Sequence, residues 1–534
     1  MKISLEGIKN PSYAQKGYLM PSFDIDTMRK NTAARPTWMH FGAGNILRAF
    51  PCVLCQRLLD AGDIDTGMVV VESYDEEIVE KAFQPYDNLS VAVSLKRDGT
   101  VEKRIVASIA EAYAYSQSRE QIEKIALSPS LQIISMTITE KGYSVTDAAD
   151  NPLPWCVGDL NSLDNPTSII GILARLLYLR FEAGQQPLTM LSLDNCSHNG
   201  TLLQEGILFM AESWVKKGLA DPLFLDYLKD AQKVAFPWSM IDKITPRPAE
   251  DVQQMLVADG LEGVELLMTE KKSFVSVMVN AEECEYLAIA DSFPNGRPPL
   301  EKTGVIFGDQ STVDKIEKMK VCTCLNPLHT CLAIYGCLLG YEKISDEMAD
   351  DMLVRLIRQI GYVEGLPVAI DPGVMSAKTF LDEVTQLRFP NPFVPDTPQR
   401  IATDTSKKIP VRFGETLKAY LAQGKQDLSF LTFIPLVFAG YARYLTGIGD
   451  DGKAFTPSPD PNLEALQLSL AGYTLGQKLD SAKLRTLFSD ASIFGVDLYS
   501  CGLGEKVEAL FEEMNSGVGA IRATIEKHLL QADA

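Results

Sequence analysis

The hydrophobic pattern changes near residue 310, and this change constrains the fold more than any other feature of the chain. Before that point, short apolar runs typical of strands alternate with amphipathic stretches typical of helices, which predicts an α/β domain. After it, long amphipathic stretches predict a mostly helical region. A chain of 534 residues also exceeds what one hydrophobic core usually holds. We therefore expect two domains, residues 1–305 and 306–534, joined near the turn-rich segment 292–299.

Individual elements can be placed from the same patterns. The strand-like runs of the first domain are 37–41, 68–72, 89–95, 131–139 and 188–193. Helix-like stretches, for example 46–61 and 167–183, lie between several of them. Two later apolar runs, 264–268 and 274–279, flank the charged residues 270–272 and predict a hairpin added to the main sheet. The helices expected in the second domain are 327–340, 346–360, 412–422, 428–445 and 505–530.

The charge and the cysteine content narrow the partners and the compartment. A net charge of −20 argues against nucleic acid, because phosphate contacts need a basic surface, and it disfavours an anionic membrane surface. The N-terminal sequence lacks the apolar core of a signal peptide, and no run approaches the ~20 uninterrupted apolar residues of a membrane helix. Ten cysteines without an export signal suggest reduced thiols and a cytoplasmic protein. Cys52 and Cys55 are expected to be small buried side chains rather than a metal or redox pair.

A glycine-rich turn follows the first strand-like run. Gly42 and Gly44 would let the backbone turn tightly and approach a pyrophosphate, while the helix that starts near Asn45 offers free N–H groups. Leu47 stands where the standard fingerprint has its third glycine, so the turn alone is a weak signal. Its place between a strand and a helix strengthens the prediction. We take Gly42, Gly44, Asn45 and Arg48 as candidate dinucleotide-binding residues.

Two carboxylates close the second strand-like run. Glu72 and Asp75 stand where a carboxylate can accept hydrogen bonds from the adenosine ribose diol and would repel a 2′-phosphate. This position predicts NAD rather than NADP. Capping of the next helix is an equally open role for both side chains.

Lys320, Asn326 and His329 lie within one ten-residue stretch, at the start of an apolar helix-patterned segment. An ammonium, an amide and an imidazole can gather there around one small polar site, and the chain has only four histidines. With the glycine turn, the trio points to a dehydrogenase without a metal. The sequence lacks the Tyr-x-x-x-Lys pair of short-chain dehydrogenases, a Cys/His cluster for zinc and the Gly-x-Ser-x-Gly elbow of hydrolases.

Seven segments, taken in order, resemble the long-chain mannitol dehydrogenase family, which includes mannitol 2-dehydrogenase, fructuronate reductase and tagaturonate reductase. They are HFGAGNILRAF (40–50), TITEKGY (137–143), LDNCSHNG (193–200), SMIDKITP (239–246), DSFPNGRP (291–298), KVCTCLNPLH (320–329) and RIATDTSKKIP (400–410). The resemblance implies an NAD-binding, Rossmann-like doubly wound sheet domain. It also implies a mostly α-helical C-terminal domain that supplies most of the substrate site, with no metal.

The resemblance further implies a role for each site residue. Lys320 is the expected general acid/base, and Asp242 is expected to move protons near it. The remaining residues are expected to hold the substrate: Asn195 and Asn326 at the reacting oxygen, His329 as a binding partner, and Arg400 with Lys408 as anchors. Without the resemblance, ordinary structural roles would also fit these side chains. The asparagines could hydrogen-bond the backbone of turns, and a lysine could be a solvated surface charge.

One spacing departs from the family pattern. Five residues separate Lys320 from Asn326, where the family usually has four. In an α-helix, one extra residue would rotate the lysine by about 100° relative to the asparagine. A π-bulge or a non-helical lead-in could absorb it. Glu317 keeps the family's spacing to the lysine and favours Lys320 over Lys318.

We therefore expect an NAD-dependent oxidoreductase that interconverts a ketose-like and a polyol-like substrate. Reduction of D-fructuronate to D-mannonate is the first choice, because the GNILRAF and TSKKIP segments look closer to the uronate reductases. Arg400 with Lys408 would suit a substrate carboxylate, although the polyol enzymes carry such a pair too. Mannitol 2-dehydrogenase and tagaturonate reductase are the alternatives, and a non-catalytic nucleotide-binding sensor is a third. The expected partner is a small sugar acid or polyol, and the sequence does not assign an oligomeric state.

Overall fold

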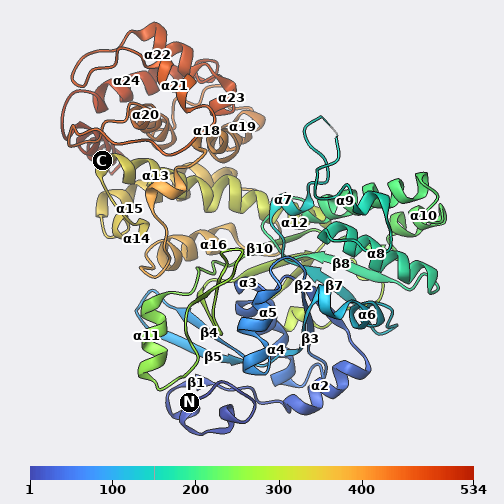
Figure 1. The fold of residues 1–534 in the computed structure, drawn as a ribbon. Helices are drawn as coiled ribbons and strands as arrows, with labels where there is room; N and C mark the ends of the chain where they lie inside the picture. Colours follow the sequence, from blue (N-terminus) through green and yellow to red (C-terminus); the bar gives the residue numbers. More distant parts are fainter. Residues whose placement is uncertain (150, 534) are drawn as a thin grey trace. The chain divides into compact units, whose positions relative to one another are not determined.

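The computed structural model describes residues 1–149 and 151–533, which form two compact units, Met1–Asp314 and Lys315–Ala534 (Figure 1). The division follows Asp314 because β15 (Ile306–Gly308) still pairs in parallel with β14 (Tyr286–Ala290) inside the first unit. The domain boundary expected after residue 305 falls just before this strand and stays a prediction. We call the two parts the sheet unit and the helical unit.

A six-stranded parallel sheet forms the centre of the sheet unit, in the order β6-β3-β2-β7-β8-β9 (Figure 1). The strands are β2 (Trp38–Phe41), β3 (Met68–Glu72), β6 (Ile109–Ala114), β7 (Ile133–Met136), β8 (Leu188–Ser192) and β9 (Val234–Ala235). Ranked along the chain, this order is that of the doubly wound dinucleotide-binding sheet, with its switch point between β2 and β7. The predicted α/β fold is confirmed.

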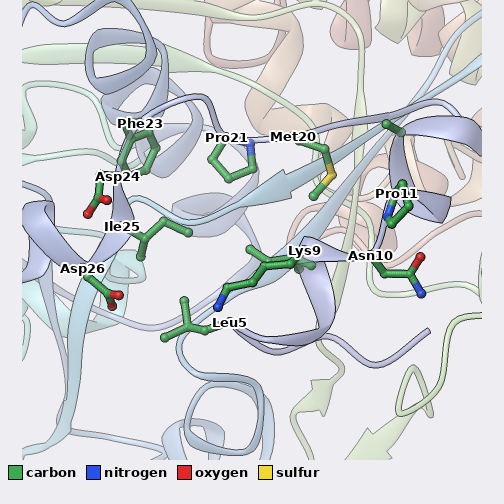
Figure 2. Close-up of a pocket in the computed structure, with 12 residues that line it drawn as sticks. Leu5, Lys9, Asn10, Pro11, Met20, Pro21, Phe23, Asp24, Ile25 and Asp26 are labelled. Atoms are coloured by element: carbon green, nitrogen blue, oxygen red, sulfur yellow. The ribbon is translucent and has the colours of Figure 1, made fainter.

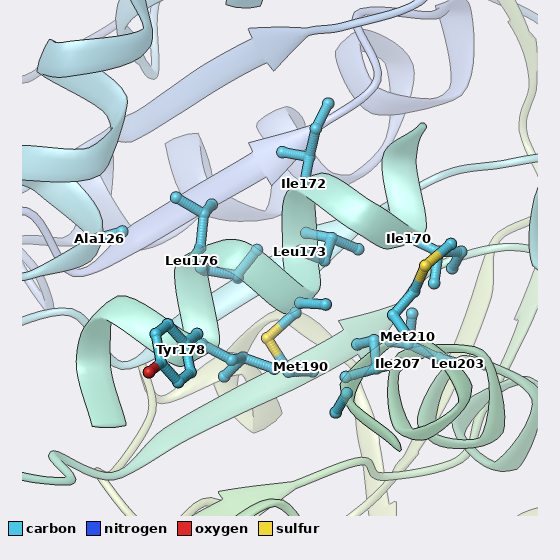
Figure 3. Packing of buried hydrophobic residues seen from close by; sticks show 14 of the residues in the cluster. Ala126, Ile170, Ile172, Leu173, Leu176, Tyr178, Met190, Leu203, Ile207 and Met210 are labelled. Carbon is cyan, nitrogen blue, oxygen red and sulfur yellow. The ribbon is translucent and has the colours of Figure 1, made fainter. Parts of the chain in front are cut away.

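The sheet is buried on both faces, which explains the continuous apolar runs of its strands. Alternate residues of β3 point to different cores: Val69 and Val71 to one, Met68 and Val70 to the other. The first core is covered by α6 (Tyr115–Ala126), α8 (Ile169–Glu182) and α9 (Asn199–Lys216), and Figure 3 shows helix side chains meeting Met190 of β8. The second is covered by α3 (Asn45–Ala49), α4 (Pro51–Ala61) and α5 (Glu77–Ala82). The predicted helix 46–61 is interrupted at Phe50, where Pro51 starts α4.

The strands outside the central sheet form smaller sheets, and this arrangement corrects the prediction that the hairpin joins the main sheet. The predicted hairpin exists as β11 (Leu267–Met268) paired with β12 (Phe274–Val275), but it is a two-stranded sheet of its own. Its apolar side chains Leu267, Met268 and Phe274 stay exposed, whereas Val275 is buried in the second core. After the hairpin the chain forms β13 (Met278–Glu282), which joins a four-stranded sheet of order β1-β5-β4-β13. The other strands of this sheet are β1 (Tyr18–Leu19), β4 (Ser90–Leu95) and β5 (Val101–Val106).

The helical unit is built around α13 (Asn326–Leu339) and α20 (Phe433–Leu445), whose side chains are mostly buried. The two helices approach closely: a Cβ added at Gly440 would lie 2.7 Å from the Tyr335 ring, and the Tyr335 hydroxyl donates to the Leu436 carbonyl at 2.7 Å. The carboxylate of Glu364 accepts hydrogen bonds from the first N–H groups of α20, which satisfies a buried helix end.

Two predicted helices of this unit differ in detail. The stretch 346–360 begins its regular helix at α15 (Asp351–Arg358) and then widens into a π-helix, η6 (Gln359–Gly365). The stretch 505–530 is two helices, α24 (Gly504–Met514) and α25 (Ala520–Ala532), because the left-handed Gly519 (φ 80°) starts a new helix. The mostly helical character predicted for this part of the chain is confirmed.

π-Helical turns recur in the helical unit. They are η5 (Lys320–Cys324), η6, η8 (Val384–Arg388) and η9 (Pro410–Gly414), and η5 packs against both η6 and η9. Such turns insert one extra residue into a helix and occur often at functional sites. Three of these turns, η5, η6 and η9, therefore lie together in the unit.

One run among the described residues, Gln310–Leu339, is long and apolar enough to cross a membrane by length and composition alone. Within it, 78% of the most apolar window is buried inside the protein, as in the core helix of a globular domain. The run is therefore weak evidence for a membrane span.

Candidate active site

The glycine turn after β2 has the backbone geometry of a dinucleotide cradle. Gly42 has φ 104°, and a Cβ at this position would lie 2.8 Å from the Thr137 carbonyl oxygen, so only glycine fits. Gly44 precedes α3 and would meet no atom within 4 Å of an added Cβ, which leaves open space at the helix N-terminus. Because this space lies at the switch point of the sheet, the turn fits a pyrophosphate held by backbone N–H groups.

Arg48 supports this turn from inside the protein. Its side chain is 1% exposed, and Nη1 donates to the Ser276 carbonyl at 2.6 Å while Nη2 donates to Asn45 Oδ1 at 3.1 Å. Burial lowers the pKa of the Arg48 guanidinium to about 10. These contacts tie the helix start to the segment before β13. A direct role of Asn45 or Arg48 in cofactor binding stays a prediction.

Glu72 joins the glycine turn to the loop after β3. Its Oε2 accepts from the Ala43 N–H at 2.7 Å, and its Oε1 accepts from the N–H groups of Tyr74 at 2.8 Å and Asp75 at 3.1 Å. Asp75 is buried, and its Oδ2 accepts from the Thr269 hydroxyl at 2.7 Å. Neither carboxylate caps α5, which has no side-chain cap. Both carboxylates order the loops around the cradle, and their contact with a ribose stays a prediction.

The other predicted residues of the sheet unit follow β8 and end β10. Asn195 is exposed just beyond β8, next to the buried Asp194, which accepts a hydrogen bond from the Tyr143 hydroxyl. Burial raises the pKa of the Asp194 carboxyl. Asp242 ends β10 (Ser239–Asp242), which pairs antiparallel with β14, and its side chain is buried.

Asn199 connects these strand ends. Its Nδ2 donates to Ser239 Oγ at 3.0 Å and to the Asp194 carbonyl at 3.3 Å, and its Oδ1 accepts from the Ser239 N–H at 3.0 Å. The matched segments 137–143, 193–200 and 239–246 therefore meet in space, through Tyr143 and Asn199. The sequence did not assign a role to either residue.

Lys320 begins the π-helix η5, which resolves the spacing anomaly. The Leu325 N–H donates to the Lys320 carbonyl five residues back, at 3.1 Å, and the Thr416 hydroxyl donates to the Cys322 carbonyl at 3.0 Å. A π turn absorbs one extra residue while the helix beyond it continues, so the π-bulge alternative is confirmed. The Lys320 side chain is 5% exposed.

His329 lies one turn into α13 and meets a carboxylate that the sequence did not single out. Its Nε2 lies 3.2 Å from Oδ2 of Asp396, a close polar contact without hydrogen-bond geometry. Arg400 pairs with Oδ1 of the same carboxylate. Burial lowers the pKa of His329, so the ring is neutral at pH 7. Burial opposes ionisation of Asp396, but His329 and Arg400 lower the pKa of Asp396 overall.

Cationic side chains concentrate beside the first turn of α13. The Nη1 of Arg412 donates to the Asn326 carbonyl at 3.3 Å and to the Thr330 hydroxyl. Burial lowers the pKa of Arg412 to about 10. Burial and the Arg412 charge lower the pKa of Lys408 to about 8, while its Nζ donates to the Ile401 carbonyl at 3.0 Å. We call Arg400, Lys408 and Arg412 the cationic cluster.

Two residues of this arrangement, Asp396 and Arg412, were not predicted from the sequence. Asp396 precedes Arg400 by four residues and Arg412 follows Lys408 by four, which is the spacing of neighbours on a helix face. That spacing was the available signal. Within the helical unit the structure thus gathers Asn326, His329, Arg400 and Lys408, and adds Asp396 and Arg412. Asn195, Asp242 and the cradle residues lie in the sheet unit.

The cysteines and other metal-ligand residue types form no comparable site in the part of the chain that the structure describes. Cys52 and Cys55 are buried in α4, and burial raises the pKa of Cys52 to about 12. Within residues 1–149 and 151–533, no group of three or more His, Cys, Asp or Glu side chains is arranged to hold a metal ion. Metal-free chemistry itself stays a prediction.

A pocket of about 460 Å³ lies in the N-terminal region (Figure 2). Its lining comes from residues 5–14 and 20–26, so no predicted site residue borders it. The amine of Lys9 in this lining pairs with Glu6 at 2.8 Å. The pocket lies outside the candidate active site.

Comparison with known proteins finds matches for both the sheet unit and the helical unit. The model of the mannitol dehydrogenase Rossmann domain matches residues 36–302, and that of the mannitol dehydrogenase C-terminal domain matches residues 312–515. The chain is 48% identical to D-mannonate oxidoreductase of Thermotoga maritima over 99% of each chain. Its fold is similar to that of a D-sorbitol dehydrogenase in substrate-free form (TM-score 0.81, 26% identity, 98% and 100% coverage). It is also similar to Pseudomonas fluorescens mannitol 2-dehydrogenase in complex with NAD and D-mannitol (TM-score 0.68, 25% identity, 99% and 100% coverage).

Proposed function

The chain belongs to the mannitol dehydrogenase family, and on that premise we propose that it reduces D-fructuronate to D-mannonate reversibly. It is an NAD-dependent oxidoreductase of the group that acts on mannonate and related polyols. The finer assignment goes to the uronate because the relative from Thermotoga maritima, at 48% identity, is a D-mannonate oxidoreductase. The substrate is then a small sugar acid. A cytoplasmic location stays a prediction.

The cationic cluster is the observation that carries this proposal. Three cationic side chains gather beside α13; Asp396 pairs with Arg400, and the charges of Asp404 and Asp460 act on Lys408. The rest of the chain is strongly acidic, with a net charge of −20, so this local concentration of positive charge runs against the overall field. Arg400 is exposed, but the burial of Lys408 and Arg412 and their mutual repulsion carry a free-energy cost, as the lowered pKa of Lys408 indicates. A substrate carboxylate would relieve that cost through charge-assisted hydrogen bonds.

The dinucleotide fits the cradle formed by Gly42, Gly44 and the N-terminus of α3. When bound, NADH supplies the hydride that reduces the ketone. In this proposal the glycine turn holds the pyrophosphate through backbone N–H groups. Glu72 holds the turn and the loop after β3 together through its hydrogen bonds to both.

The side chains supply the remaining steps. In this proposal the amides of Asn195 and Asn326 donate to the oxygen on which negative charge develops, at about 3 kcal/mol for one such donor. The ammonium of Lys320 gives a proton to that oxygen, and the neutral amine takes it back in the oxidative direction. Asp242 exchanges the proton with water. His329 stays neutral beside Asp396 and binds a substrate hydroxyl. No metal ion takes part.

Parallel assays of NADH oxidation test the proposal. D-Fructuronate, D-tagaturonate and D-fructose are compared at equal concentrations, and kcat/KM is expected to be highest for D-fructuronate. Preference for D-tagaturonate or D-fructose would reassign the chain to the tagaturonate reductases or the mannitol 2-dehydrogenases. Binding of NADH without turnover of any of the three would support a nucleotide sensor instead.

A further inference from the structure

The β11–β12 hairpin holds the loop that follows β3. The buried Thr269 hydroxyl donates to Asp75 Oδ2 at 2.7 Å, and the Lys271 amine donates to the Tyr74 carbonyl. Both contacts join segments nearly two hundred residues apart in sequence, within the sheet unit. The loop is therefore ordered by the hairpin as well as by Glu72, whose Oε1 accepts from its backbone N–H groups.

This arrangement presents an aromatic ring to solvent. The side chain of Tyr74 is 73% exposed, although Glu72 and Asp75, which are close to it in sequence, are buried. The Lys271 amine lies 4.0 Å from the ring centroid, over one face. A cation on one face fixes the orientation of the ring, and the exposure of the side chain leaves ring surface available for stacking.

The position of the ring indicates what would stack on it. In a doubly wound sheet with this strand order, the adenosine half of a dinucleotide lies beyond the carboxyl end of the second strand, which here is β3. Tyr74 stands two residues beyond that end. Aromatic side chains stack on any nucleobase, because every base has a π-face.

We propose that the hairpin and Tyr74 form an adenine platform, in which the Tyr74 ring stacks on the adenine of the dinucleotide. Lys271 orients the ring, and Thr269 fixes the loop through Asp75. The platform binds the half of the cofactor that does not react, so it is independent of the identity of the sugar substrate. This role would explain why most apolar side chains of the hairpin stay exposed, since the hairpin holds a ligand-binding loop in place.

Calorimetric titration with ADP-ribose tests the platform without any turnover. ADP-ribose carries the adenosine and pyrophosphate but no nicotinamide, so its affinity reports this half of the site alone. Tyr74→Ala is expected to weaken ADP-ribose and NADH about tenfold each, since stacking on one base is lost. Tyr74→Phe should keep the wild-type affinity because the ring remains, and Lys271→Met should weaken both ligands about threefold as the cation over the ring is lost.

The helical unit offers a matched control. Phe430 is 52% exposed, and the Lys425 amine lies 4.8 Å from its ring centroid, so Phe430→Ala removes a similar exposed aromatic elsewhere. This variant should bind ADP-ribose like the wild type. Thermal melting of each variant separates lost binding from lost folding. Unchanged ADP-ribose affinity in a folded Tyr74→Ala variant would overturn the platform, as would no binding of ADP-ribose by the wild type. Failure of uronate turnover would leave these titrations unaffected, so the two proposals fail separately.

Discussion

The sheet unit and the helical unit recognise ligands by different means. In the sheet unit the cradle is made of backbone: a glycine with φ 104°, an open helix N-terminus and a carboxylate that bonds backbone N–H groups. In the helical unit the candidate site is made of side chains, with Lys320 on a π turn and the cationic cluster beside α13. Backbone recognition depends on chain shape, whereas side-chain recognition depends on charge and on the register of each helix.

This difference teaches which substitutions should affect which ligand. Changes of charge in the helical unit should alter the handling of the sugar and leave the affinity for NADH intact. Changes in the cradle or its loops should act on the dinucleotide. Three predictions test that division, in order of decreasing effect, and a fourth compares the stability of the two units.

Loss of the proposed proton donor should have the largest effect. Lys320→Ala is expected to lower kcat by about a thousandfold, because general acid/base catalysis typically contributes 10²–10⁴. The dissociation constant for NADH, measured by fluorescence titration, should stay within twofold of the wild type. Lys318→Ala is the matched control in the preceding helix and should retain turnover. Equal losses in the two variants would remove the special role of Lys320.

Loss of a buried cation should come next. Arg412→Met is expected to lower kcat/KM for D-fructuronate by about a hundredfold, since a desolvated charge pair typically contributes 2–5 kcal/mol. The value for D-fructose, which has no carboxylate, should change much less. Lys418→Met, an exposed lysine paired with Glu415, is the control. A parallel loss with both sugars would mean that Arg412 only supports α13 through Asn326 and Thr330.

The pH should tune substrate affinity through Lys408. Its pKa is lowered to about 8 by burial and by Arg412 and Arg400, against the opposing charges of Asp404 and Asp460. The amine is charged below that pH and neutral above it, so KM for D-fructuronate should rise as pH increases past 8, at most about tenfold per unit. KM for D-fructose should stay flat. Lys408→Arg keeps its charge and should abolish the rise; a rise that persists in this variant would assign the titration elsewhere.

The smallest effects concern stability, where one buried group in each unit, His40 and Glu347, should contribute opposite pH dependences. Burial in β2 lowers the pKa of His40 from 6.5 to about 3. The unfolded chain therefore binds a proton below pH 6.5 that the buried His40 ring does not bind, so His40 contributes a loss of stability to the sheet unit as pH falls. Burial raises the pKa of Glu347 well above 4.5, so the unfolded chain releases a proton that the folded carboxyl keeps, and Glu347 contributes a loss of stability to the helical unit as pH rises.

Calorimetric melting of Glu347→Gln checks the second half of that prediction. The amide cannot ionise, so the variant should melt a few degrees above the wild type at pH 8.5 and close to it at pH 4.5, given at most about 1.4 kcal/mol per pH unit. A pH-independent difference would show that the substitution acts through packing against Gly336 rather than through ionisation.

The sheet unit was the more predictable of the two, for physical reasons. Parallel strands buried on both faces leave long apolar runs, and the glycine turn is a local feature that follows its strand directly. The hairpin was misplaced because two-residue strands carry no information on which sheet they join. The hydrogen bond from Tyr143 to Asp194 joins two segments that are far apart in sequence, so no local sequence pattern predicts it.

The helical unit was less predictable, because its site depends on features that the sequence pattern does not show. Its helices follow from amphipathic periodicity, but a π turn leaves no trace except a spacing that does not fit, as between Lys320 and Asn326. Asp396 and Arg412 belong to the site through contacts with His329 and with the first turn of α13, which only the folded unit provides. Helical spacing to Arg400 and Lys408 hinted at both, yet the same spacing occurs on any solvated helix face.

Equilibrium binding of D-mannonate and D-mannitol measures the central claim most directly. The two molecules differ mainly in the carboxylate, and with the protein saturated by NADH neither is oxidised, so calorimetry reports recognition alone. We predict that D-mannonate binds at least about a hundredfold tighter, as expected for a carboxylate held by the partly buried cations Lys408 and Arg412. Equal affinities, or tighter binding of D-mannitol, would contradict the assignment of an anionic substrate to the helical unit.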